Sequence, residues 1–172
     1  MITLKESILS STNSGIPGMK DKIARFEFEP YMVSYLEKQV AFYKVRSRKE
    51  LRDVILAYLN IAGNECSLNW IDTSRIVDMS GIFRGTGFNG KIDKWNTSNV
   101  KNMYVLFWGA YNFNQDISGW DVSKVDNMKC MFLDAESFNQ DISNWKIKLG
   151  CQTEGVFFGC HIKEEYKPDG LK

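Results

Sequence analysis

From Trp70 onward a tryptophan recurs every 25 residues, at Trp70, Trp95, Trp120 and Trp145. This constant interval constrains the fold more than any other feature of the sequence. A unit so short cannot bury its own apolar face and must stack that face on neighbouring copies of itself. The sequence therefore predicts a repeat protein in which the stack is the core.

Apolar residues accompany the tryptophans in register. Residues 113–125 and 138–147 are almost copies of one another, and 88–100 is a looser copy. Aligning them places Ile71, not Trp70, at the tryptophan position of the first repeat, which makes Trp70 a cap or junction residue. The alignment gives five apolar columns, which are Ile92/Ile117/Ile142, Ile76/Val100/Val125, Met79/Met103/Met128, Ile82/Leu106/Met131 and Phe83/Phe107/Phe132/Phe157.

Two patterns within each repeat predict secondary structure. The segment Trp-x-[Thr/Val]-x-x-Val alternates as a short strand does, whereas Met-x-x-[Leu/Met]-Phe-x-x-Ala has helical spacing. We therefore expect an α/β repeat solenoid of the leucine-rich-repeat type, with a short strand and a short helix per repeat. Asn89, Asn114 and Asn139 also recur, which favours turns in which the side-chain amide binds backbone groups or the next repeat.

Three segments follow from these patterns. Residues 1–65 are expected to form a leader and a mostly helical cap domain, 66–162 a solenoid of about four repeats, and 163–172 a charged tail. The clearest cap element begins with a capping box at Ser47–Glu50, continues with apolar residues at helical spacing and ends at Gly63. A second helix is expected after Pro30, with short strands on either side of it at 26–29 and 42–45.

The overall charge names no partner, since 22 lysines and arginines balance 21 acidic residues. Nucleic acid is therefore not an expected partner. The N-terminus lacks the apolar segment of a secretory signal, and no window approaches the length that spans a bilayer. We expect a soluble, cytoplasmic protein, and its four sparse cysteines are expected to be reduced thiols.

The motifs of catalysis are missing, so we expect a protein that is not an enzyme and needs no cofactor. His161 is the single histidine, and no phosphate-binding or dinucleotide-binding glycine motif occurs. Asp116 and Asp141 occupy equivalent points of successive repeats, which favours a structural role, although weak calcium binding there stays open. Cys151, Cys160 and His161 offer three zinc ligands without a near fourth, so we expect no metal site.

Comparison between repeats indicates where a partner protein would bind. The second repeat has Tyr104, Trp108 and Tyr111 where the third has Lys129, Leu133 and Glu136. Exposed aromatic side chains of this kind make good binding hot spots. A competing interpretation is that the N-terminal segment folds back and covers them. The predicted partner-binding residues are Arg84, Tyr104, Trp108, Tyr111, Leu133 and Phe158.

The motifs Phe-Asn-Gln-Asp-Ile-Ser-x-Trp and Val-x-x-Met-x-x-Met-Phe resemble those of the bacterial leucine-rich-repeat surface proteins typified by BspA. The resemblance covers roughly residues 66–160. It implies a non-enzymatic repeat module used for adhesion or protein recognition. Because the chain as written shows no export signal, we expect an intracellular inhibitor or adaptor. The alternative is a surface adhesin of the BspA type whose export signal is missing here.

Overall fold

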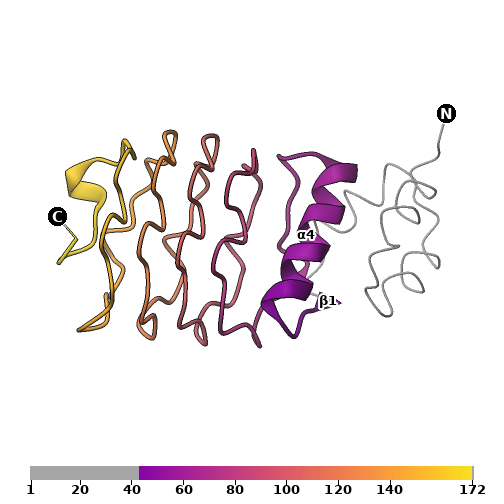
Figure 1. The fold of residues 1–172 in the computed structure, drawn as a ribbon, viewed down its shortest axis with the longest axis horizontal. Helices are drawn as coiled ribbons and strands as arrows, with labels where there is room; N and C mark the ends of the chain where they lie inside the picture. The colour runs from indigo at the N-terminus through magenta and orange to yellow at the C-terminus, as the bar shows by residue number, and fades with distance from the viewer. Residues whose placement is uncertain (1–42, 172) are drawn as a thin grey trace.

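The computed structural model describes residues 43–171, and every structural statement below concerns this part of the chain. Its elements in chain order are β1 (Tyr43–Lys44), α4 (Arg48–Ala62), β2 (Ile71–Asp72) and the 3-10 helix η2 (Glu164–Tyr166). Between α4 and η2 the backbone forms a row of similar loops (Figure 1). We call each loop a rung and number the rungs 1 (71–94), 2 (95–119), 3 (120–144) and 4 (145–162).

The predicted α/β repeat solenoid is wrong. Residues 95–160 contain no helix and no extended strand, only turns joined by single bridges between neighbouring rungs. The bridges are parallel and link Asp78 to Asn102, Asn102 to Asn127 and Asn127 to Gln152. A two-residue strand occurs in rung 1 alone, where β2 pairs in parallel with β1. The strand-plus-helix unit of leucine-rich repeats is therefore absent from these rungs.

The backbone conformation explains why the helical spacing does not produce a helix. The segments 79–86, 103–110, 128–135 and 153–160, here called the turn array, contain residues in the left-handed region at regular places. Val105 (φ 49°), Cys130 (φ 53°) and Asp134 (φ 56°) are among them, alongside glycines at equivalent positions. A left-handed residue interrupts a right-handed helix. The apolar side chains still point inward at intervals of three and four, but they do so from a chain of tight turns.

Hydrogen bonds in the turn array alternate between two directions. Some N–H groups close turns within their own rung, as Ile82 N does to Met79 O at 3.3 Å. The N–H groups between them donate to carbonyls of the next rung, as Gly81 N does to Tyr104 O at 2.9 Å. Each of rungs 1 to 3 therefore donates four main-chain hydrogen bonds to the next rung, which satisfies these backbone groups without regular secondary structure.

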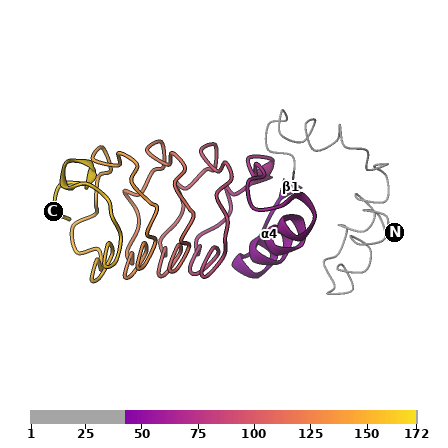
Figure 2. The same cartoon turned by 90° about the horizontal axis from the view of Figure 1, so that it is seen from above.

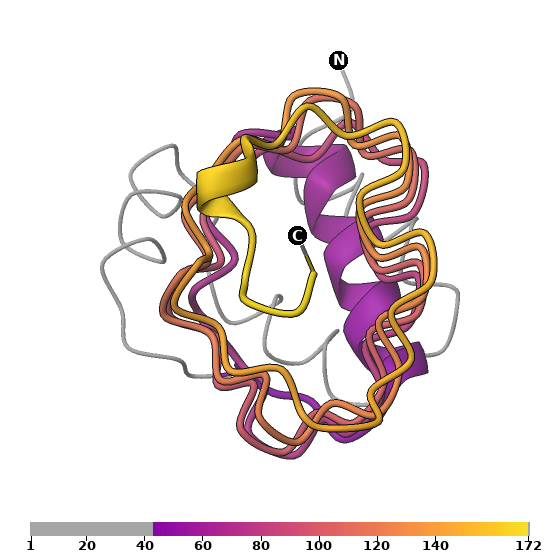
Figure 3. The same ribbon diagram turned by 90° about the vertical axis from the view of Figure 1, so that its left-hand side faces the viewer.

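Aromatic ladders fill the interior of the stack. Phe83, Phe107, Phe132 and Phe157 stack face to face, with ring centroids 5.4, 5.3 and 5.7 Å apart. Viewed along the stack the rungs superpose closely, which shows how each column repeats (Figure 3). The indole Nε1–H of Trp95, Trp120 and Trp145 donates to a carbonyl of the preceding segment at 2.9, 3.1 and 3.2 Å respectively. Both burial and hydrogen bonding thus follow the 25-residue interval.

The predicted register at the start of the stack is confirmed. Ile71 N donates to Leu68 O, as Trp95 N does to Ile92 O, so Ile71 occupies the tryptophan position of rung 1. Trp70 instead meets Tyr58 of α4 edge to face, with ring centroids 5.0 Å apart. It is therefore a junction residue between the helix and the stack.

Helix α4 covers the N-terminal end of the stack, as the view from above shows (Figure 2). Ser47 caps it by accepting a hydrogen bond from Glu50 N at 3.1 Å, and Gly63 ends it with φ 79°. The buried face of the helix consists of Leu51, Val54, Ile55 and Tyr58. This confirms the helix predicted before Gly63.

Two arginines of α4 complete the hydrogen bonding of rung 1. Ser80 and Ile82 are the rung 1 equivalents of Tyr104 and Leu106, whose carbonyls accept hydrogen bonds from the preceding rung. Here Arg48 Nε donates to Ser80 O, and an Arg52 guanidinium nitrogen donates to Ile82 O at 2.8 Å. The same nitrogen also donates to Gly81 O. The helix therefore replaces a missing rung both by its apolar face and by its donors.

The asparagine columns and the tail tie rungs together on the other side of the stack. Asn89 Oδ1 accepts from Asn114 N at 2.9 Å, and Asn114 Oδ1 accepts from Asn139 N at 3.0 Å, so the predicted turn role is confirmed. The tail continues the pattern, because Lys163 N donates to Asn139 Oδ1 at 3.0 Å. The η2 segment then passes over the end of rung 4 (Figure 3).

Some predictions fall elsewhere in the chain. The helix after Pro30, the strand at 26–29 and the leader all lie outside the described residues. The strand predicted at 42–45 corresponds to β1, of which Tyr43–Lys44 are described.

Candidate partner-binding face

The predicted partner-binding residues lie on the outward side of the turn array, and we call them the aromatic face. Four of them form one row along the stack, because the ladder fixes their order. Gly85 N donates to Trp108 O, Gly109 N to Leu133 O and Asp134 N to Phe158 O, each at 2.8 Å. Arg84, which precedes Gly85, begins this row.

The side chains of the row differ in exposure. The Arg84 guanidinium lies over the Trp108 ring, 4.0 Å from its centroid. A cation held against an indole face is attracted by the ring quadrupole. Trp108 and Leu133 are half-buried between neighbours, whereas Phe158 is 73% exposed at the end of the row.

Tyr104 and Tyr111 flank this row. Tyr104 is 43% exposed, and the next two residues in its column, Lys129 and Glu154, form an ion pair at 3.3 Å. Tyr111 is 55% exposed and lies close to the glycine backbone, since a Cβ built on Gly109 would lie 3.7 Å from its hydroxyl. The structure thus gathers aromatic, aliphatic and cationic groups on one side of rungs 1 to 4.

Sequence reasoning missed other exposed apolar side chains. Val77 is 49% exposed and Leu149 is 99% exposed. Arg48 was also missed, although it lies beside the N-terminal edge of the aromatic face, near Gly81. The sequence does contain a signal for Val77. This valine shares its column with the charged residues Lys101 and Asp126, and an apolar residue in such a column is expected to be exposed. No sequence signal pointed to Arg48.

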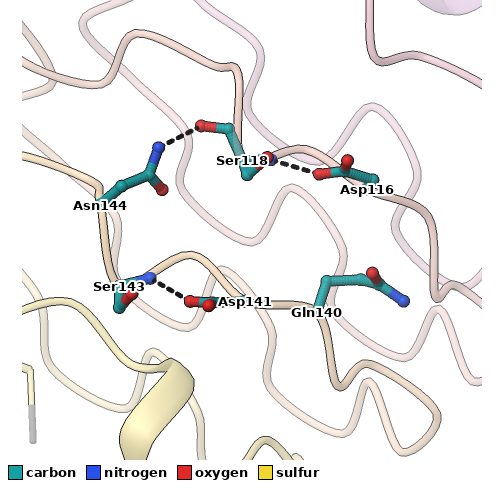
Figure 4. A pocket seen from close by; sticks show the side chains of 6 residues that line it. All are labelled: Asp116, Ser118, Gln140, Asp141, Ser143 and Asn144. Atoms are coloured by element: carbon teal, nitrogen blue, oxygen red, sulfur yellow. Dashed lines mark hydrogen bonds between the residues drawn. The ribbon is translucent and has the colours of Figure 1, made fainter.

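A polar hollow lies where rungs 2 and 3 meet, and it contains the aspartates considered above (Figure 4). Ser118 N donates to Asp116 Oδ1 at 2.9 Å, and Ser143 N donates to Asp141 Oδ1 at 3.0 Å. Asn144 Nδ2 donates to Ser118 O at 3.0 Å and so links the two rungs. These polar groups hold the turns and the stack together.

The same hydrogen bonds affect the acidity of the aspartates. Hydrogen bonds from Ser118 lower the pKa of Asp116 below its ordinary value, and bonds from Ser143 do the same for Asp141. The serine groups favour the charged carboxylate. Both aspartates are therefore carboxylates at neutral pH.

Two of the residues considered for zinc, Cys160 and His161, contact main-chain carbonyls. Cys160 Sγ lies 3.4 Å from Phe138 O, and burial raises the pKa of its thiol. His161 Nδ1 lies 2.9 Å from Glu136 O. Across residues 43–171, no group of three or more histidine, cysteine, aspartate or glutamate side chains is arranged to hold a metal ion.

Fold and face together define a class of protein: a capped stack of irregular 25-residue rungs that carries an outward aromatic face. A family model described as "Mycoplasma protein of unknown function, DUF285" matches residues 54–167, from within α4 to just past η2. The match spans more than half of the chain, and the chain belongs to this family.

Comparison with curated proteins and with solved structures found no match. No helix within residues 43–171 has the length and apolar character needed to cross a membrane.

Proposed function

We propose that the chain is a non-enzymatic recognition module, an inhibitor or adaptor, which binds another protein through the aromatic face. The observation that carries the proposal is that Tyr104, Tyr111 and Phe158 are large, exposed and unnecessary for stacking. In rungs 1 to 3 the inner columns bury their side chains almost completely, and they hold the rungs together without these residues. Outward aromatic residues therefore need another role, and binding supplies one.

The composition of the face suits protein recognition. Tyrosine, tryptophan and arginine dominate binding hot spots, because each removes a large surface from water at modest entropic cost. Trp108 and Arg84 are already in contact before binding. Their arrangement reduces the ordering cost of association.

A second candidate is a surface adhesin of the BspA type, which the repeat motifs of residues 66–160 favour. Such an adhesin would bind through the same face, but it would act at the cell surface. Cell fractionation of the native host distinguishes the two functions, since a cytoplasmic inhibitor or adaptor remains inside the cell and an adhesin reaches its surface.

Truncation of the face tests binding. A pull-down from the native host identifies the partner, and calorimetric titration with the purified partner then gives the affinity. Trp108→Ala and Tyr104→Ala should each weaken binding by at least about 2 kcal/mol, the scale of hot-spot truncation. Their melting temperatures should stay close to that of the unmodified chain, because neither side chain belongs to an inner column.

Leu149→Ala is the matched control, since this exposed leucine lies outside the face. It should leave both affinity and melting temperature unchanged. If Trp108→Ala or Tyr104→Ala instead unfolds the protein as a core mutation does, the aromatic residues serve internal packing and the proposed face is wrong.

A further inference from the structure

The hydrogen-bond ladder gives the stack two chemically different ends. From rung 2 to rung 3, four N–H groups donate to four carbonyls over 2.8–3.0 Å. Rung 3 donates to rung 4 in the same way. At the first end, Arg48 and Arg52 of α4 occupy carbonyls of rung 1. At the last end, the equivalent N–H groups of rung 4 meet no acceptor within residues 43–171; they belong to Thr153, Gly155, Phe157 and Gly159.

The side chains at this edge also lack a covering rung. Phe132 is completely buried, whereas Phe157, its equivalent in rung 4, is only partly buried. Phe158 is 73% exposed, while Leu133, its equivalent in rung 3, is half-buried. The tail covers a different part of the end, since Tyr166 O accepts from Ile142 N at 3.1 Å. Lys167 of the tail reaches the edge, where its Nζ lies 5.8 Å from the Phe157 ring centroid, but no carbonyl of the described tail accepts from the four N–H groups.

We propose that this edge, Thr153–Gly159, is a second docking site, which binds a segment of another protein by main-chain pairing. The incoming segment supplies carbonyls at the spacing of one further rung and places an apolar side chain on Phe158. Addition of a backbone segment to an open edge gives affinity through main-chain hydrogen bonds and specificity through alternate side chains. The edge adjoins the aromatic face and shares Phe158 with it, and it adds a contact through main-chain N–H groups that the face does not use.

The direction of the hydrogen bonds argues against other occupants. Two copies of this chain cannot pair through the same edge, because both would offer donors. The opposite end of a second copy has its carbonyls of Ser80 and Ile82 already bonded to arginines. A small anion is disfavoured because Glu154, whose side chain is 71% exposed, lies within the same edge. A segment that brings neutral carbonyl groups fits best.

Amide hydrogen exchange measured by NMR on the full chain tests the edge directly. In the free protein, the amides of Met128, Cys130, Phe132 and Asp134 should exchange at least about 100-fold more slowly than those of their rung 4 equivalents. Protection of the rung 4 amides in dilute free protein would overturn the proposal, because the chain would then cover its own edge. Protection that rises with protein concentration alone would also overturn it, in favour of a second copy.

The probe is a synthetic peptide of residues 126–137 with Cys130→Ser, the segment that covers the equivalent edge of rung 2. Near saturation it should slow exchange of the four edge amides by at least about tenfold, while a peptide of reversed sequence should not. Phe158→Asp should abolish this protection, and Leu149→Asp should preserve it. An unchanged exchange pattern with the peptide, or equal protection by the reversed peptide, would overturn the proposal.

Failure of this test is separate from failure of the aromatic face. Trp108→Ala removes a side chain of rung 2 and should leave peptide protection at rung 4 intact. Partner binding that depends on Trp108 without edge protection would refute the docking edge alone.

Discussion

Left-handed residues are the smallest features that determine this fold. Gly81, Gly85, Gly109, Gly155 and Gly159 adopt positive φ in the turn array. Val105, Cys130 and Asp134 adopt it at equivalent positions in spite of their side chains. An L-residue pays roughly 1–2 kcal/mol for this conformation, so the rung-to-rung hydrogen bonds must hold it in place.

Gly85 allows this conformational cost to be measured alone. A Cβ added at Gly85, where φ is 65°, meets nothing within 4 Å. Gly85→Ala should therefore lower the free energy of unfolding by about 1 kcal/mol through backbone strain only. Chemical denaturation gives the value.

Gly119→Ala is the control for that substitution, because its added Cβ also meets nothing and its φ lies outside the left-handed region. It should be neutral or stabilising by about 0.4–1 kcal/mol. If the two substitutions had equal effects, the positive φ of Gly85 would not be the reason that glycine is needed there.

Each rung combines an inner aromatic column with outer turns held by aspartate and asparagine, and both parts have testable energetics. Phe132 is the centre of the inner column: it is fully buried, and its ring lies 5.3 Å from Phe107, 4.2 Å from Phe138 and 5.7 Å from Phe157. Phe132→Ala should cost about 3–5 kcal/mol of stability, because it leaves a cavity between fixed neighbours. A loss below about 1 kcal/mol in equilibrium denaturation would mean that the column does not support the stack.

The aspartate turns predict acid sensitivity. Hydrogen bonds from Ser118, Ser123 and Ser143 hold the pKa values of Asp116, Asp121 and Asp141 below the ordinary 3.8. The unfolded chain therefore takes up these protons at a higher pH than the folded chain. Their contribution to stability is complete above the unfolded pKa and is lost as pH falls through the lowered folded values.

The melting temperature should accordingly fall as the pH is lowered from about 5 through 3.8 and below it. Asparagine keeps the acceptor oxygen without the titrating proton, and Asn96 already accepts from Ser98 N in the same way at 3.0 Å. Replacing the three aspartates by asparagine should reduce the fall. An unchanged pH dependence would assign it to other carboxylates.

The inner columns and the capping helix α4 could be predicted from the sequence, and the secondary structure of the rungs could not. Apolar periodicity reports which side chains are buried, and Met79, Ile82 and Phe83 are all buried. The same period of three and four fits a helix and a chain of tight turns equally well. The distinguishing feature, positive φ, is signalled by Gly81 and Gly155 but not by Val105 or Cys130 at equivalent points.

The aromatic face was predictable as a set for a similar reason. Its members stand at variable positions between the columns, and the comparison of repeats picks them out. Their contacts were not predictable, because the stacking of Arg84 on Trp108 and the closeness of Tyr111 to Gly109 depend on how the turns fold.

At the scale of the whole molecule, α4 substitutes for a rung by matching hydrogen bonds as well as apolar area. Arg52 is the key residue, since one of its nitrogens contacts both Gly81 O and Ile82 O. Arg52→Met keeps most of the aliphatic stem but leaves these carbonyls without that donor. It should lower the unfolding free energy by about 1–3 kcal/mol, the cost of leaving the buried acceptor Ile82 O unsatisfied, while Gly81 O still accepts from Arg84 N at 3.3 Å.

Arg75→Met is the comparison for Arg52, because Arg75 is exposed in rung 1 and donates no hydrogen bond among the described residues. Its stability, measured by thermal and urea unfolding, should stay within about 0.5 kcal/mol of the unmodified chain. Equal losses for both variants would indicate that overall charge, and not carbonyl capping, is responsible.

Because every inner junction uses the same ladder, the stack is modular in length. A tandem duplication or deletion of 25 codons would insert or remove one rung and leave both caps matched to their neighbours. Such a change preserves the interior yet lengthens or shortens the outward face by one set of variable residues. Recombination between repeats can therefore vary the outward face of this architecture without redesigning its core.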